Sequence, residues 1–293
     1  AASLVSTSVF AGEMAVTGSA SMGMSGHSGG DNLHEATTFS MGNQLTFSGS
    51  GELDNGMTVS LSFVLDQGDA APAPFDGHSV TVSSDSMGTL AFHGEGGSSA
   101  ASALDTTAAG DIWNNGFTHG AAVAYVGMGG SDATNNKSVN YTLPTLMDDL
   151  AVAVSYSGQT TATNSTTAFG VTYTGVEGLS VSYGAGEAGS TTANTAADVT
   201  TMKASYAIGS FTAAVSQTDS DLTTGTDEEL SSFKISYTVT DDLSISYGEE
   251  THETSGQTVD EEFSQISASY TTGGMTLSAA VQEATGLGNN SGV

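Results

Sequence analysis

Residues 233–250, FKISYTVTDDLSISYGEE, alternate between apolar and polar side chains on both sides of a short turn. In the first half, Phe233, Ile235 and Tyr237 share one face of an extended strand. After the turn at 240–242 the same alternation resumes in LSISY. Strict alternation across a tight turn predicts an antiparallel β-hairpin, and this pattern constrains the fold more than any other feature of the chain.

The composition favours many such hairpins over helices. The chain of 293 residues contains 38 glycines and only 3 prolines, and serine and threonine recur throughout. This usage is typical of short strands joined by turns, so we expect an all-β fold. No apolar run is long enough for a transmembrane helix. If the chain crosses a membrane, it must do so as a closed β-barrel, because only closure satisfies every backbone group in lipid.

The formal net charge of −29, with three lysines and no arginine, excludes one class of partner and restricts another. Nucleic-acid binding depends on Lys and Arg that neutralise phosphates, so we expect no nucleic-acid partner. Contact with anionic lipid headgroups is also unfavourable unless divalent cations bridge the charges. Cysteine is absent, which excludes disulfides and cysteine-based metal sites.

Alternating segments recur along the chain and give fifteen predicted strands. These are 14–24, 45–53, 57–65, 79–84, 89–93, 138–142, 150–157, 169–173, 179–183, 202–206, 211–217, the two strands of 233–250, 263–270 and 275–282. Short turns alternate with long polar connections near 25–44, 66–77, 94–136, 158–166, 186–198, 219–229 and 252–261. This asymmetry is typical of transmembrane antiparallel barrels in outer membranes, which have short periplasmic turns and longer extracellular loops.

The tyrosines occupy two repeated positions on the predicted strands. One row ends strands just before short turns and contains Tyr141, Tyr173, Tyr206, Tyr237 and Tyr270. The other lies near the far ends of the returning strands and contains Tyr156, Tyr183 and Tyr247. Two aromatic rows at two heights predict the girdles of a membrane barrel. A β-sandwich explains single hairpins but not two registered rows.

The two ends of the chain suggest a partial sequence. Residues 1–11 are small and apolar, and Val9, Phe10 and Ala11 form an acceptable cleavage triplet, so we interpret this segment as a signal-peptide remnant before a barrel at 12–293. A disordered or strand-forming N-terminus is the alternative. Because bacterial barrels have an even number of strands, fifteen predict a 16-stranded barrel whose closing strand is missing here.

Four segments together resemble a known family. They are MAVTGSASMGM (14–24), LTFSGSGELDNGMTVSLSF (45–63), VTVSSDSMGTLAFHGEGG (80–97) and KSVNYTLPTLMDDLAVAVSYSG (137–158). Their order and spacing resemble those of Gram-negative general diffusion porins of the alphaproteobacterial type. The resemblance implies a homotrimer in the outer membrane of a Gram-negative bacterium, without cofactor or enzymatic activity. Each water-filled barrel would pass small hydrophilic solutes, and a constriction loop at about 94–136 would fold into it.

The resemblance also suggests pore-lining residues. The acids of the long loop, Glu95, Asp105, Asp111 and Asp132, would charge the constriction, unless the loop is an ordinary solvated one. By strand alternation Lys203 and Lys234 face the pore and could form a reduced basic wall; the alternative is two solvated lysines without function. In the family an acidic loop faces several basic residues, so the lack of arginine is a clear departure.

Two acidic groups are predicted to lie in the long loops. The first contains Asp219, Asp221, Asp227, Glu228 and Glu229, and the second contains Glu249, Glu250, Glu253, Asp260, Glu261 and Glu262. Hard divalent cations favour such oxygen ligands, but no EF-hand spacing is present. Solvated surface charge is therefore the simpler interpretation, with divalent cations as a possible partner.

The function predicted from these patterns is passive diffusion through a cation-selective pore. Acids outnumber lysines 32 to 3, and a like-signed mouth concentrates counter-ions. The alternative is a structural or adhesive cell-surface protein without a conducting pore. An enzyme is not expected: residues 26–30 fit G-x-S-x-G formally, but the strand, turn and helix that this motif needs are not predicted there.

Overall fold

The computed structural model describes residues 14–26, 37–66, 75–114, 137–158, 165–188, 197–222 and 226–287. Within these residues, fifteen strands form one antiparallel sheet, and each pairs with its neighbours in sequence. They are β1 (Ala15–Gly26), β2 (Thr37–Glu52), β3 (Thr58–Asp66), β4 (Phe75–Ser84), β5 (Gly88–Glu95), β6 (Ser138–Thr142), β7 (Leu150–Ser157), β8 (Thr166–Val176), β9 (Leu179–Ala188), β10 (Ala197–Ile208), β11 (Phe211–Leu222), β12 (Glu228–Thr240), β13 (Leu243–Thr254), β14 (Glu261–Thr272) and β15 (Met275–Thr285).

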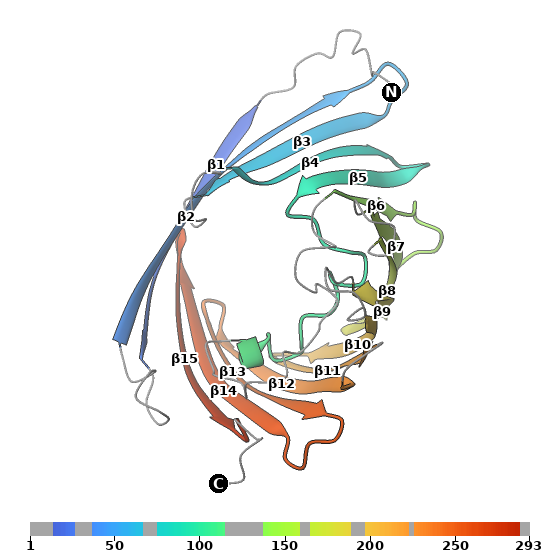
Figure 1. Ribbon diagram of the computed structural model, residues 1–293. Helices are drawn as coiled ribbons and strands as arrows, with labels where there is room; N and C mark the ends of the chain where they lie inside the picture. The colour runs from blue at the N-terminus through green and yellow to red at the C-terminus, as the bar shows by residue number, and fades with distance from the viewer. Residues whose placement is uncertain are drawn as a thin grey trace.

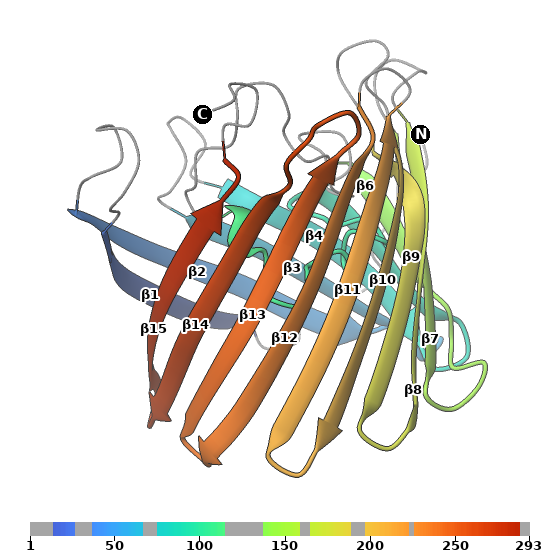
Figure 2. The same ribbon diagram turned by 90° about the horizontal axis from the view of Figure 1, so that it is seen from below.

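The sheet curls around an open interior, and part of the chain after β5 lies inside it (Figure 1). From the side, β8–β15 run as tilted neighbours that short turns join at one end (Figure 2). The predicted all-β class and the fifteen predicted strands are confirmed. A sixteenth, closing strand stays a prediction, and the proposed signal-peptide remnant at 1–11 lies outside the described residues.

Several predicted loop boundaries were wrong because strands extend well beyond the apolar alternation. β2 begins at Thr37, within the predicted loop 25–44, and β4 begins at Phe75. Most members of the two acidic groups also lie in β11–β14, and only Asp227 and Asp260 lie in connections. Where both faces of a strand carry polar residues, the contrast that reveals alternation disappears, although the backbone pairing continues.

The two faces of the sheet differ in chemistry. Val154, Val215 and Ile235 are exposed on the outer face, and Phe47 and Phe63 stack there with ring centroids 4.7 Å apart. The alternating serines and threonines face inward. A broad apolar outer surface around a polar interior inverts the arrangement of a soluble domain and matches a lipid-facing barrel.

Helix is almost absent from the described ranges, which contain only the 3₁₀ helix η1 (Ile112–Asn114). None of the helical structure described there is long and apolar enough to cross a membrane. The small apolar core lies between the internal segment and the wall, where Ala109 and Ile112 pack against Phe263. Among the described residues, the strands form the wall, and the apolar clusters inside it hold the chain that follows β5.

Glycines with positive φ close the tight turns. Gly178, between β8 and β9, has φ +78°, and a Cβ there would lie 2.3 Å from the carbonyl oxygen of Ala207 on β10. Gly209, between β10 and β11, has φ +58° with open space around it. Glycine is therefore required at position 178 for two reasons, its positive φ and the close approach of Ala207. At position 209 only the positive φ requires it.

We expect Gly178→Ala to destabilise the barrel more than Gly209→Ala. The positive φ alone costs an L-residue about 1–2 kcal/mol. The contact with Ala207 adds a steric term only at Gly178. The free energy of unfolding in urea, measured for both variants in the same detergent, would test this, and equal values would contradict the role of close approach.

A candidate constriction formed by the inner loop

Residues 96–114, called the inner loop here, lie against the inner wall of the barrel (Figure 1). Three serines on β7, β11 and β12 accept hydrogen bonds from its backbone amides. The pairs are Ala100 N to Ser155 Oγ at 2.9 Å, Ala108 N to Ser216 Oγ at 2.8 Å, and Ala109 N to Ser232 Oγ at 2.9 Å. Because the loop has almost no secondary structure, the wall must satisfy backbone groups that a helix would satisfy internally.

Glu250 on β13 is the most buried attachment point, with 1 % of its surface exposed. One carboxylate oxygen accepts a hydrogen bond from the Thr107 hydroxyl, and the other accepts one from the Trp113 amide at 2.8 Å. The amide of Ile112 also donates to this carboxylate. A buried carboxylate requires such charge-assisted hydrogen bonds, so Glu250 and the loop depend on one another.

Thr107 also organises the loop itself. Its hydroxyl oxygen accepts hydrogen bonds from the amides of Gly110 at 3.0 Å and Asp111 at 2.7 Å. In return, the Thr107 amide donates to Asp111 Oδ1 at 2.9 Å. Asp111 has φ +57°, a conformation that Asp tolerates better than most residues. The turn at 107–111 is thus closed on itself and then attached to Glu250.

Lys203 on β10 is directed at the same turn. Its Nζ donates to the carbonyl oxygens of Thr106 at 3.0 Å and Thr107 at 3.4 Å. Its charge also interacts with Asp111, Lys234 and Asp105, in that order of strength. Lys203 therefore lies on the inner face and its ammonium group binds the loop, while its role in a basic pore wall stays a prediction.

Small residues let the loop lie close to the wall. A Cβ at Gly170 would come within 2.3 Å of the Ala100 carbonyl oxygen, and one at Gly248 within 2.8 Å of Ala109 Cβ. Elsewhere along the loop, Ala101 packs against Val199 on β10. Larger side chains at these glycines would displace the loop away from the wall, so the glycines help to fix the position of the loop.

The other predicted pore residues have the following positions. Glu95 ends β5, opposite His78, and Asp105 lies on the inner loop. Lys234 lies on the inner face of β12, paired with Gly248. Asp132 lies outside the described residues. The structure thus brings Asp105, Asp111 and Lys234 near Lys203, while a constriction role for these residues stays a prediction.

Glu250 was placed wrongly by the sequence reasoning, which assigned it to an acidic loop. It lies in β13 and, like Ser246, alternates with the outward-facing Tyr247, so it points inward. Extending the alternation of 243–247 by three residues would have found this orientation. The donors from the inner loop could not have been found, because they are more than 130 residues away in sequence.

Two members of the acidic groups, Glu228 and Glu261, meet His252 on the inner face. His252 Nδ1 lies 3.2 Å from Glu261 Oε2, and His252 Nε2 lies 3.9 Å from Glu228 Oε1. All three side chains are buried. In the described ranges, no group of three or more His, Asp or Glu side chains has an arrangement that could hold a metal ion.

The predicted girdle tyrosines lie on strands, and seven of the eight are well exposed. These seven are Tyr156, Tyr173, Tyr183, Tyr206, Tyr237, Tyr247 and Tyr270. Tyr141 is half-buried, and its hydroxyl donates to the Met87 carbonyl oxygen at 2.7 Å. Tyr206, Tyr237 and Tyr270 lie just before short turns, as the first row requires. Contact of these rings with the membrane boundaries remains a prediction.

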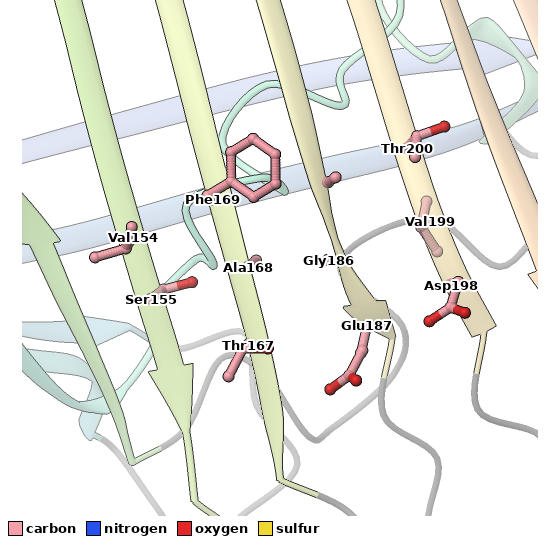
Figure 3. Close-up of a pocket in the computed structure, with 11 residues that line it drawn as sticks. Val154, Ser155, Thr167, Ala168, Phe169, Gly186, Glu187, Asp198, Val199 and Thr200 are labelled. Atoms are coloured by element: carbon pink, nitrogen blue, oxygen red, sulfur yellow. The ribbon is translucent and has the colours of Figure 1, made fainter.

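A hollow of about 510 Å³ lies across β7–β10 (Figure 3). Val154, Phe169 and Thr200 line it, and Glu187 and Asp198 lie beside each other near the strand ends. In register, these side chains belong to the outer face of the wall. The hollow is therefore separate from the passage beside the inner loop.

A curled antiparallel sheet with an apolar outer surface, a hydroxyl-rich interior and one loop packed inside defines an outer-membrane channel. The sequence matches the family described as Gram-negative porin over residues 1–292, and the chain belongs to that family. It is accordingly an outer-membrane protein and not an enzyme. No curated protein sequence matches the chain significantly.

Solved porin structures share the fold at low sequence identity. A mutant of the Rh. blastica porin aligns with TM-score 0.70 and 14% identity, covering 94% of this chain and 96% of that one. The anion-selective porin from Comamonas acidovorans aligns with TM-score 0.66 and 13% identity, covering 93% and 90%. At this identity the comparisons establish the fold, while pore properties depend on the residues of this chain.

We expect Glu250→Ala to loosen the inner loop and raise single-channel conductance. The substitution removes the acceptor for Thr107 and for two backbone amides, each worth about 1–3 kcal/mol when left unpaired in a buried site. Glu249→Ala is the matched control, because the neighbouring Glu249 faces outward. Conductance and current noise in planar bilayers would be measured for both variants. Equal traces for Glu250→Ala and wild type would contradict the anchoring role.

Proposed function

We propose that this porin passes small hydrophilic solutes and ions by passive diffusion, with a preference for cations, and that residues 96–114 narrow its lumen. The observation that carries the proposal is the attachment of the inner loop to the inner wall through Glu250, Lys203 and three serines. A loop held inside an otherwise hydroxyl-lined barrel reduces the area open to solutes without closing it.

The preference for cations rests on this chain's charges. The Comamonas porin is anion-selective, so the shared fold does not set the sign. Here acids outnumber lysines 32 to 3, and many acids lie near the strand ends farthest from the short turns. Of the three lysines, Lys203 lies beside the loop acids Asp105 and Asp111, and Lys234 lies near Lys203. These lysines offset only part of the inner-face acids, and the acidic mouth adds to the preference for cations.

Reversal potentials under a KCl gradient should show a preference for potassium that weakens as salt rises. The Debye length is about 10 Å at 0.1 M and about 3 Å at 1 M, so rising salt screens the electric field of the acidic residues at the mouth. Lys234→Gln should strengthen the preference without removing a bond to the loop, and Glu229→Gln on the outer face should leave it unchanged. A chloride preference at low salt would rule out the proposal. Complete absence of conductance would favour the structural or adhesive alternative.

Divalent cations are proposed as partners of the outer surface. Asp219, Glu229 and Glu253 are direct neighbours across β11, β12 and β13 and share the outer face. Glu187, Asp198 and Asp221 form a second such row across β9, β10 and β11. Like charges directly opposite one another destabilise a sheet. Divalent cations that bridge these carboxylates to lipid phosphates would relieve the repulsion.

Chelation of divalent cations should lower the thermal stability of the barrel in outer-membrane lipid. Each like-charged pair costs up to about 1 kcal/mol when it is not neutralised. Glu229→Gln, at the centre of the first row, should raise stability in EDTA and reduce the response to added calcium. The transition temperature by circular dichroism would be compared with that of Lys234→Gln, which changes charge on the inner face. Identical responses of all three proteins would exclude a role for these rows.

The homotrimer is also a proposal, supported by membership of the porin family. The outer face of β1 and β2 carries several strongly exposed apolar side chains, among them Met22, Met24 and Phe39. Either lipid or a second subunit could cover such a surface. Chemical crosslinking in native membranes distinguishes the two, since a trimer yields a discrete crosslinked species and a lipid-covered monomer does not.

A further inference from the structure

Two opposite parts of the inner wall differ in charge. The inner faces of β10–β14 carry Lys203, Lys234, Glu250 and the group around His252, and the inner loop adds Asp105 and Asp111. β1–β3 lie across the opening from this side (Figure 1). The register identifies their inner face, because the row through Ser155 continues through Asn140, Ala91, Thr81, Ser60 and Ser50.

The inner face of β1–β3 is lined by hydroxyl and amide groups and is called the hydroxyl wall here. Its polar members are Thr17, Ser19, Ser21, Ser25, Ser40, Gln44, Thr46, Ser48, Ser50, Thr58, Ser60 and Ser62. Among the side chains described there, only Glu52 is ionisable, and it lies at the turn end of β2. The hydroxyl wall therefore presents no basic group to the acids of the inner loop.

The half-buried charged side chains on the loop side are equal in number for the two signs, and the further acids there, Glu228, Glu250 and Glu261, are buried. Asp105 and Asp111 balance Lys203 and Lys234 in number, and Lys203 interacts electrostatically with the other three. The Glu250 carboxylate is occupied by donors from the loop. A strong field across a passage requires opposite charges on facing walls of low dielectric constant. In this porin the opposite charges are neighbours on one wall.

We propose that the passage between the inner loop and the hydroxyl wall does not discriminate between neutral polyhydroxylated solutes and zwitterions of equal size. The inference rests on the proposed channel function. Without a field across the passage, a dipolar solute is neither oriented nor retarded. A sugar or polyol exchanges hydrogen bonds with water for hydrogen bonds with wall hydroxyls, which both donate and accept, and this exchange is nearly neutral in free energy.

Liposome swelling would test the inference with the purified wild-type porin. A neutral pentose and a zwitterionic amino acid of similar size should enter at a ratio close to one. Ser48→Lys with Ser62→Lys places two cations at paired positions of the hydroxyl wall. This double variant should change the ratio by about threefold, because it creates the missing field. Ser48→Gln with Ser62→Gln adds similar bulk without charge and should keep the ratio close to one.

The outcomes separate this inference from the channel function. A wild-type ratio far from one overturns the inference, as does an unchanged ratio in a lysine double variant that still conducts ions. If the double variant does not assemble, the single variant Ser60→Lys on β3 provides the same test. Failure of both solutes to enter, with no ion conductance, would instead contradict the proposed channel function.

Discussion

Each strand of this sheet separates two environments, and that single constraint determines most of the sequence. Successive side chains point to opposite faces, so a strand between lipid and a water-filled interior must alternate. Ile245 and Tyr247 are exposed outward, while Ser246 bonds Ser267 across the inner face at 2.7 Å. A shift of pairing by one residue would exchange the two faces along the whole strand. The continuous register from β1 to β15 follows from this requirement.

The same alternation explains how a loop can be held inside. A serine-lined inner face offers hydroxyl acceptors at regular intervals, and the inner loop uses three of them for its amides. Glu250 adds a carboxylate on a strand where water is excluded, so its hydrogen bonds to Thr107 and Trp113 are strong and specific. Glycines at Gly170 and Gly248 bring the loop against the wall. The position of the inner loop thus depends on the strands as much as on the loop itself.

Strand positions could be predicted from the sequence wherever one face was apolar. β7, for example, begins and ends where the alternation predicts, at Leu150–Ser157. The prediction failed at strand ends such as Thr37–Gln44 and in the acidic segments, because there the residues of both faces are polar or the periodicity is irregular. The contacts between the inner loop and the wall were harder to predict than the strands. That Lys203 faces inward follows from its neighbours, but its bonds to Thr106 and Thr107 depend on the path of a distant loop.

The net charge of the chain does not by itself determine the charge that lines the pore. Acids in β11–β14 alternate like every other residue, so Glu229 and Glu253 face outward while Glu228 and Glu250 face inward. The outward acids meet the membrane side, and Glu250 is occupied by hydrogen bonds to the loop. Near the inner loop, Lys203 and Lys234 offset Asp105 and Asp111. The field that a permeating solute meets therefore depends on the inner-face residues and the mouth, and outward-facing acids such as Glu229 and Glu253 contribute less to it.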